Sequence, residues 1–143
     1  MKTKLKVKKL HPLAVIPKFA LPGDVGMDLF AVDSHEIKPN TIARIPTGIA
    51  MELPKGYAGL VWDKGGLSHK HGLKTLGGVL DQGYRGDLTV GLINLSNKKY
   101  VVKAGDKVAQ ILIQKIEQPK IVVTNSLSKS KRGEGRYGST GIK

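Results

Sequence analysis

Short apolar runs separated by turn residues recur along the chain, and this pattern predicts strands. The runs are rich in Val, Ile and Leu, and Gly, Pro, Asn or Asp stand between them. Residues 36–40 are expected to form a turn, and only residues 66–70 have the pattern of a short helix. The predicted strands cover residues 4–8, 27–31, 41–46, 49–53, 57–62, 88–95, 100–102, 108–116 and 121–123. Since turn signals come about every 8 to 12 residues, we expect an all-β domain, a sandwich or barrel of jelly-roll type.

The stretch from Gly77 to Asp87 combines an apolar run, turn residues and a carboxylate. Val79 and Leu80 lead into Asp81, Gln82-Gly83 supplies turn residues, and a strand follows from residue 88. This order predicts a β-hairpin that holds Asp81 and the ring of Tyr84 near its tip. The hairpin backbone could also bind a flat polar ligand edge. A simpler interpretation is that Asp81 only caps a turn, as Asp often does.

Length and composition favour one soluble domain followed by a polar tail. At 143 residues, a single body over residues 1–125 is expected. From residue 126 to 143 the chain is rich in Ser, Lys, Arg and Gly, which predicts a flexible arm. The chain has no cysteine and no apolar segment that could span a membrane, so we expect a cytoplasmic protein without disulfides.

The charge balance points to a phosphate-bearing partner. Lys and Arg number 24 against 11 Asp and Glu, which gives a net charge of +13. Such an excess attracts nucleotides or nucleic acid, although solvation alone accounts for most surface lysines. The four histidines have no metal-site spacing beyond His69-x-His71, and no Ser-His-Asp pattern is present.

Two glycine-containing segments could bind an anion through backbone N–H groups. The strongest spans residues 132–141, where glycines flank Tyr137 and two hydroxyl residues follow. A plain disordered tail would have a similar composition. Residues 64–68 are a shorter segment of the same kind, and they are a weak signal by themselves. Residues 105–110 contain a Gly-Asp turn before a strand, which is common, and Gln110 on that strand could face solvent or a ligand.

Taken in order, five stretches of this chain resemble the five motifs of the trimeric dUTP diphosphatase (dUTPase) family. They are residues 23–29, 64–68, 78–87, 105–110 and 132–141. The resemblance implies a jelly-roll subunit of β-clip type, in a homotrimer with active sites shared between subunits. It implies hydrolysis of dUTP to dUMP and pyrophosphate by attack of water on the α-phosphorus. That reaction limits uracil in DNA and supplies dUMP for thymidylate synthesis.

The resemblance also assigns roles to residues. Asp81 would orient and activate the water, Tyr84 would pack under the deoxyribose, and Tyr137 would stack on uracil. Mg²⁺ would be bound mainly by the triphosphate, and Asp28 would contact it only through water. No membrane and no specific nucleic acid are implied as partners. The implied substrate contacts are Lys64, Gly65, Gly66, Thr75, Gly78, Val79, Leu80, Tyr84, Thr89, Gln110, Arg132, Tyr137, Gly138, Ser139 and Thr140.

The chain departs from the family pattern at several positions. Lys64 and Gly65 stand where the second motif usually has Arg-Ser, so a hydroxyl and a bidentate guanidinium are absent. Arg136 and Tyr137 replace a glycine and a phenylalanine, and Thr75 replaces an asparagine found in some members.

Two other functions are weighed against this one. A related dCTP deaminase would need a glutamate at the position of Gly91, and glycine cannot transfer a proton. A non-enzymatic nucleotide- or nucleic-acid-binding protein would explain the lysines but not Asp81, which repels phosphate.

Overall fold

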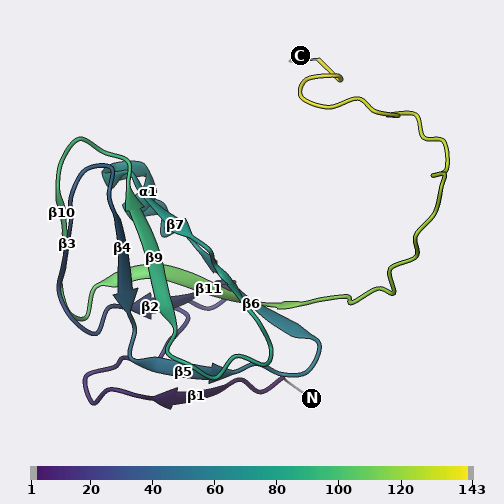
Figure 1. The fold of residues 1–143 in the computed structure, drawn as a ribbon. Coiled ribbons are helices and arrows are strands. Elements are labelled where there is room, and N and C mark those ends of the chain that lie inside the picture. Colours follow the sequence, from purple (N-terminus) through teal and green to yellow (C-terminus); the bar gives the residue numbers. More distant parts are fainter. Residues whose placement is uncertain (1–2, 142–143) are drawn as a thin grey trace.

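The computed structural model describes residues 3–141, which fold into eleven strands and one short helix (Figure 1). The expected all-β class is confirmed. Helix α1 spans Gly65–His71, and no helix of the described residues is long and apolar enough to cross a membrane. The strands are β1 (Lys6–Lys9), β2 (Met27–Phe30), β3 (His35–Ile37), β4 (Ile42–Pro46), β5 (Ile49–Glu52), β6 (Tyr57–Trp62), β7 (Leu73–Leu76), β8 (Val79–Leu80), β9 (Thr89–Asn94), β10 (Tyr100–Val102) and β11 (Lys107–Lys115).

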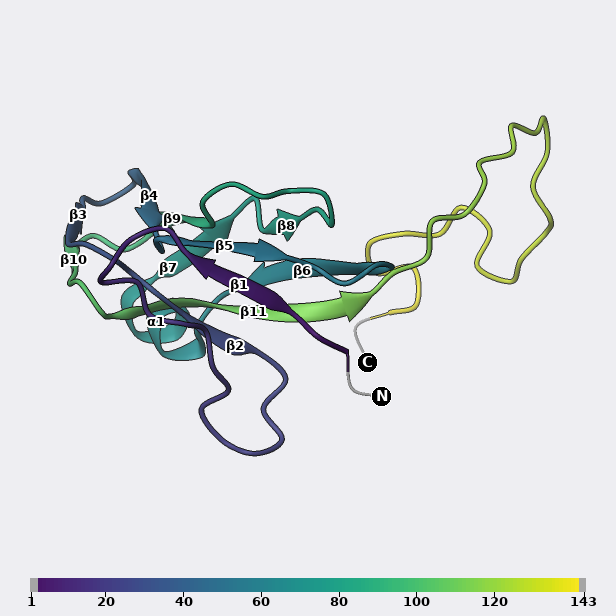
Figure 2. The same cartoon turned by 90° about the horizontal axis from the view of Figure 1, so that it is seen from below.

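The strands pair antiparallel in two main sheets and two smaller pairs. One sheet has the order β2-β11-β6-β8 and the other the order β4-β9-β7. Strand β1 pairs with β5 and β3 with β10, and Figure 2 shows β1, β5, β6 and β11 lying roughly lengthwise along the body. Inward-facing aliphatic residues such as Leu29, Ile45, Ile49, Leu92 and Ile111 are fully buried between the sheets. This aliphatic core holds the strand ends that surround the site.

The predicted hairpin between residues 79–80 and 88–95 is wrong, because the two strands belong to different sheets. Leu80 pairs with Gly59 of β6, and β9 pairs with β4 and β7. The chain therefore crosses from one sheet to the other between Asp81 and Leu88. Strand β8 lies at the edge of its sheet, and Thr89 and Val90 of β9 extend beyond the part of β9 that pairs with β7. The backbone groups that a hairpin would have bonded to each other are therefore not paired between β8 and β9.

Three other local predictions are corrected. Residues 36 and 37, which belong to the turn expected at residues 36–40, lie in β3, and residues 73–76 form β7, which was not anticipated. Both strands have partners that are distant in sequence, since β3 pairs with β10 and β7 with β9. The strand expected at residues 121–123 is absent. Its side chains are 88, 73 and 92% exposed, because no neighbouring strand of the described chain reaches them.

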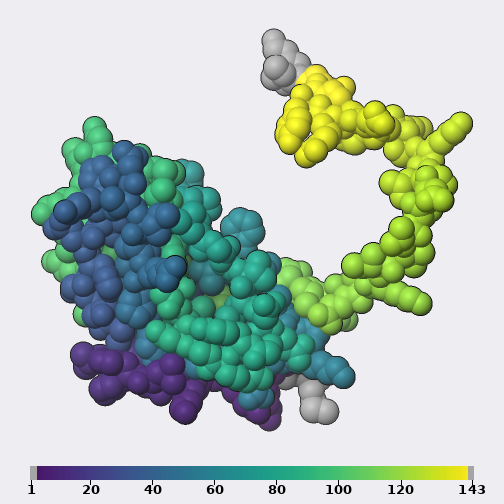
Figure 3. Space-filling model, in the orientation of Figure 1, coloured from purple at the N-terminus to yellow at the C-terminus, as the bar shows by residue number. Residues whose placement is uncertain are grey.

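The described chain beyond β11 contains neither helix nor strand and leaves the body (Figure 1). Figure 3 shows this segment, in yellow-green to yellow, standing away from the packed strands. Within the described residues, the hydrogen bonds of residues 126–141 are all local and none reaches a strand. The boundary at residue 125 and the flexibility of the arm stay predictions. Residues 1–2 and 142–143, which fall within the expected body and arm, lie outside the described residues.

Candidate active site

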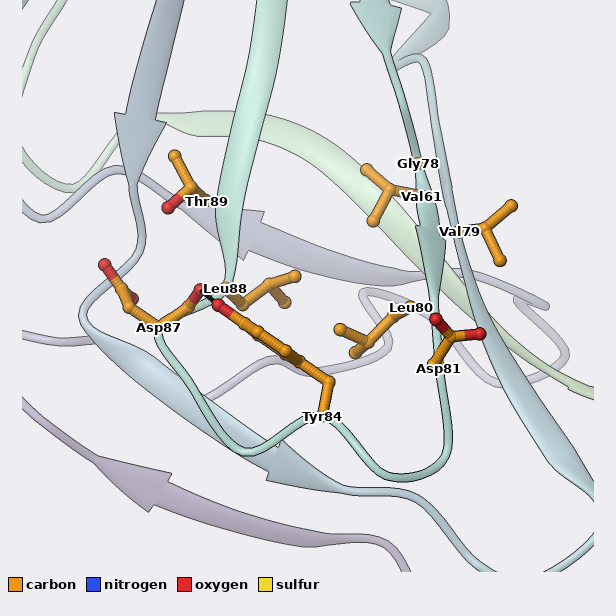
Figure 4. Close-up of a pocket in the computed structure, with 9 residues that line it drawn as sticks. All are labelled: Val61, Gly78, Val79, Leu80, Asp81, Tyr84, Asp87, Leu88 and Thr89. Carbon is orange, nitrogen blue, oxygen red and sulfur yellow. Dashed lines mark hydrogen bonds between the residues drawn. The ribbon is translucent and has the colours of Figure 1, made fainter.

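A pocket of about 240 Å³ lies where β8 and β9 separate (Figure 4). Asp81 and Tyr84 come from the crossing loop, and Thr89 begins β9. The lining residues are Val61, Gly78, Val79, Leu80, Asp81, Tyr84, Asp87, Leu88 and Thr89. Six of the residues singled out from the sequence are thus brought together, namely Gly78, Val79, Leu80, Asp81, Tyr84 and Thr89.

Two close backbone contacts fix the walls of this pocket. Gly78 has a left-handed φ of 95°, and its carbonyl accepts a hydrogen bond of 2.7 Å from the N–H of Val61. A Cβ at Gly78 would lie 2.8 Å from the carbonyl oxygen of Val61, so only glycine fits. On the other wall, Leu88 donates its N–H to Ile49 and accepts hydrogen bonds from the backbone and hydroxyl of buried Thr47. Both walls are therefore anchored to neighbouring strands.

Tyr84 lies across the crossing loop between the side chains of Asp81 and Asp87 (Figure 4). Its hydroxyl donates a 2.9 Å hydrogen bond to the backbone carbonyl of Asp87. A Cβ on Gly86 would overlap the Tyr84 hydroxyl, so glycine at that position lets the ring lie close to the loop. Tyr84 is 47% exposed and lines the pocket, so part of its side chain is available to a ligand.

The two carboxylates of the pocket differ in their surroundings. Asp81 is exposed at the end of β8, where it can reach a ligand or water in the pocket. Asp87 is half-buried, and its Oδ1 is a buried atom without a hydrogen-bond partner in the described chain. Asp87 was not among the candidate residues from the sequence, where it was one of several acids without a local partner.

A second polar cluster surrounds Asp28 on β2. The carboxylate is buried, Lys64 Nζ lies 2.6 Å from its Oδ1, and Lys107 Nζ forms an ion pair of 2.7 Å with its Oδ2. Burial alone would raise the pKa of Asp28, but the ammonium groups of Lys107 and Lys64 lower it below its ordinary value. Lys107, like Asp87, was not predicted as a site residue, because its approach to Asp28 depends on strand register.

Asp63, which directly precedes Lys64, holds the backbone at the start of residues 64–66 through several hydrogen bonds. Its Oδ1 accepts hydrogen bonds of 2.7 Å from both the N–H and the hydroxyl of Thr75, and its Oδ2 pairs with Lys74. Burial alone would raise the pKa of Asp63, but these bonds lower it. Gln110 donates a 2.8 Å hydrogen bond to the carbonyl of Asp63. Thr75 and Gln110 therefore have protein partners in this chain.

The residues predicted to contact phosphate do not line the pocket that contains Asp81. Gly65 and Gly66 begin α1, and a Cβ on either would meet no atom within 4 Å. Thr75 lines a neighbouring hollow of about 160 Å³ that shares Val61, Gly78 and Val79 with the main pocket. None of Lys64, Gly65, Gly66 and Gln110 is among the lining residues of either hollow. A single described chain thus presents two separate polar regions.

The arm forms a third region with its own local structure. Arg132, Ser139 and Thr140 line a hollow of about 330 Å³ together with Lys131. Tyr137 is 91% exposed, and the guanidinium carbon of Arg136 lies 4.7 Å from its ring centroid. Gly138 has a left-handed φ of 87°, which permits the turn that follows Tyr137. The arm therefore brings cations and hydroxyls together without help from the body.

The described residues contain no group of three or more His, Cys, Asp or Glu side chains that could hold a metal ion. Mg²⁺ does not require such a cluster, because it usually keeps several water ligands. The oxygens of a triphosphate are suitable ligands, because Mg²⁺ commonly binds proteins through substrate phosphates and few carboxylates.

Comparisons with known proteins agree on one family. The family model described as dUTPase matches residues 13–141. The chain is 38% identical over 141 residues to the deoxyuridine 5'-triphosphate nucleotidohydrolase of Helicobacter pylori, covering 97% of each chain. It is 42% identical over 139 residues to that of Clostridium kluyveri, covering 96% of this chain and 97% of the relative.

Solved structures show the same likeness. A variant dUTPase of Staphylococcus bacteriophage 80alpha with dUpNHpp superposes with a TM-score of 0.92 and 27% identity, covering 99% of this chain and 100% of the other. A variant dUTPase of phage phi11 of S. aureus, described with a structural Mg(II) ion, has a TM-score of 0.81 and 26% identity. The second match covers 86% of this chain and 97% of the other.

Proposed function

This chain belongs to the dUTPase family and hydrolyses dUTP to dUMP and pyrophosphate, and on that premise we propose how its residues divide the work. Asp81 orients the water that attacks the α-phosphorus. The pocket between β8 and β9 binds the nucleoside, with uracil against the backbone of Val79, Leu80 and Thr89 and the deoxyribose over Tyr84. The observation that carries the proposal is the convergence of these residues on one pocket where two sheets separate.

The chemistry of the reaction fits this arrangement. Phosphoryl transfer depends chiefly on positioning and on neutralising charge, so one carboxylate that aligns water suffices. Free backbone groups on the separated strands can pair with the polar edge of a base. The ring of Tyr84, held by the carbonyl of Asp87, offers a flat surface that would crowd a 2′-hydroxyl. These contacts favour a deoxyribonucleoside over its ribose counterpart.

We assign Lys64, Gly65, Gly66 and Gln110 to the phosphates, together with Arg132, Gly138, Ser139 and Thr140 of the arm. Because the first group lies outside the nucleoside pocket, we propose that a complete site combines the nucleoside pocket of one chain with the phosphate residues of another. The arm closes over the ligand, with Tyr137 stacked on uracil. The exposed apolar residues 121–123 support this assembly, since they lack a partner within the described chain.

A homotrimer is the assembly that we propose for these shared sites. A heterologous contact between a nucleoside pocket and a phosphate region closes into a ring when the rotation permits, and three chains then give three equivalent sites. Light scattering should give three times the chain mass of 15.4 kDa. A monomer at micromolar concentration would contradict the proposal.

Mg²⁺ is the cofactor that we propose, bound mainly by the triphosphate, in line with the lack of a three-ligand cluster in the described chain. When bound, it would neutralise phosphate charge. Asp28 remains a candidate for a contact through water, although its two oxygens face lysines. Thr75 remains a candidate for a base contact through its oxygen lone pairs, since its hydroxyl hydrogen is directed at Asp63.

A complementation experiment tests the shared site. The variants Asp81→Asn and Lys64→Met are each expected to be defective, and we would co-express them with different tags and purify the mixed oligomers. If one chain supplies Asp81 and another Lys64, roughly a third of the sites in the purified mixed trimers regain both groups. The rate of pyrophosphate release from dUTP should then be several times higher than the average of the two parent variants. Activity no higher than that average would place both residues in one chain's site.

A further inference from the structure

The buried carboxylate of Asp28 lies between two lysines that come from different elements. Lys64 precedes α1 and Lys107 begins β11, and each ammonium group contacts one carboxylate oxygen. The side chain of Asp28 is 3% exposed, whereas those of Lys64 and Lys107 are 29% and 46% exposed. The cluster therefore holds one buried negative charge and two positive charges that reach solvent.

A β-bulge places Lys107 on this cluster. Gln110 pairs with Asp28 and Lys107 pairs with Phe30, and the register shifts between Lys107 and Ala109. In a regular strand, residues 107 and 110 would point to opposite faces of the sheet. The extra residue turns both side chains to the face that carries Asp28. Bulges are frequent beside active sites, where they redirect a side chain in this way.

The net charge of the cluster determines whether Lys64 can offer a positive charge to a ligand. A buried carboxylate needs a compensating charge, because an unpaired one is strongly disfavoured. If Lys64 were the only partner, its charge would be used to neutralise Asp28. With Lys107 present, one positive charge remains in excess. The neighbouring acid Asp63 does not consume it, since Asp63 is paired with Lys74 and Thr75.

We propose that Lys107 is a positioning residue for triphosphate binding, which acts by balancing Asp28 so that Lys64 presents its charge to the phosphates. Lys107 need not touch the substrate. This inference rests on the proposed function, in which Lys64 contacts the triphosphate. It also gives the bulge in β11 a purpose, since a regular strand would leave Asp28 with Lys64 alone.

The first test compares ligands that differ in phosphate charge. Lys107→Met should weaken binding of the non-hydrolysable triphosphate dUpNHpp about tenfold, because Asp28 would then neutralise the charge that Lys64 otherwise presents to the phosphates. Binding of dUMP should change much less. Lys107→Arg should keep nearly full affinity, because the charge is retained. The matched control is Lys99→Met, which removes a lysine whose partner is the exposed Glu36. Calorimetric titration of each chain with dUpNHpp and with dUMP gives the affinities to be compared.

A double-variant cycle separates charge balance from a merely structural role. In an Asp28→Asn background the carboxylate no longer consumes a charge, so adding Lys107→Met should have little further effect on dUpNHpp binding. Melting temperatures would verify that each variant is folded. An equal loss in both backgrounds, or an equal loss for dUMP and dUpNHpp, would overturn the inference.

The variant Lys64→Met shows whether a failed test refutes the role of Lys107 or the proposed phosphate contact of Lys64. If Lys64→Met leaves dUpNHpp binding unchanged, the phosphate contact in the proposed function is wrong and the inference falls with it. If Lys64→Met weakens binding but Lys107→Met does not, only the role of Lys107 is refuted.

Discussion

The crossing loop from Asp81 to Leu88 and the arm from residue 126 to 141 differ in how they are held. The loop is fastened at Leu88 to Ile49 and Thr47, and the Tyr84 hydroxyl is bonded to the backbone of Asp87. The arm has only local turns, such as that closed by Ser139 N–H and the Arg136 carbonyl. Both regions carry proposed substrate contacts, but only the loop is bonded to the strands of the body in the described chain.

This difference matches two requirements of the reaction. The water on the α-phosphorus must be aligned accurately, which favours a carboxylate on an anchored loop. The substrate must also enter and leave, which favours contacts that form only on closure. Ordering the arm has an entropic cost that its contacts with substrate must exceed. Changes in the loop should therefore alter the chemical step, and changes in the arm should alter capture and closure.

The largest effect is expected from Asp81→Asn, which removes the carboxylate from the anchored loop. The rate of pyrophosphate release should fall about 10²–10⁴-fold, since the amide aligns water poorly and cannot accept its proton. Binding of dUpNHpp and the melting temperature should remain close to the parent values, because Asp81 is exposed. Asp33→Asn, at another exposed acid, is the control. An unchanged rate for Asp81→Asn would refute the mechanism.

Removal of residues 130–143 tests the proposed role of the arm in capturing and enclosing the substrate. Loss of the stacking expected of Tyr137, about 1–3 kcal/mol, would by itself lower turnover of dUTP roughly 5- to 150-fold. Because the truncation also removes Arg132, Ser139 and Thr140, its effect should be no smaller. The melting temperature should hardly change, because the buried core ends in β11. Tyr137→Ala is the finer variant and should account for part of the loss. Full activity would make the arm a plain appendage, and unfolding would make it structural.

The smallest effect is expected at Gly65, which belongs to the anchored body but lacks a side chain. Gly65→Ser should raise kcat about tenfold, because a hydroxyl bonded to phosphate is typically worth about 1.5–3 kcal/mol. The position has space for a Cβ and does not have a left-handed φ, so serine should fit without strain. Gly65→Ala separates the hydroxyl from the loss of backbone freedom. Equal rates for the Ser and Ala variants would show that the hydroxyl contributes nothing.

The sequence determined most of the strand content and six of the nine residues that line the pocket between β8 and β9. Predicted strands at residues 57–62 and 100–102 agree with β6 and β10 at both ends. Residues 78–81, Tyr84 and Thr89 were grouped correctly because they are neighbours along the chain or lie at the ends of one loop. Alternating burial, turn residues and local proximity are all encoded within short windows of sequence.

Only the tertiary structure decided which strands pair and which charges meet. Strand β8 pairs with β6 and not with β9, which opens the pocket that a hairpin would have closed. The shift of register in β11 brings Lys107 to Asp28, and β7 exists because β9 lies beside it. Residues 121–123 have strand-like sequence but no neighbour to bond with in the described chain. Hydrogen bonds between strands and ion pairs across a bulge join residues that are far apart in sequence, so a local pattern carries no record of them.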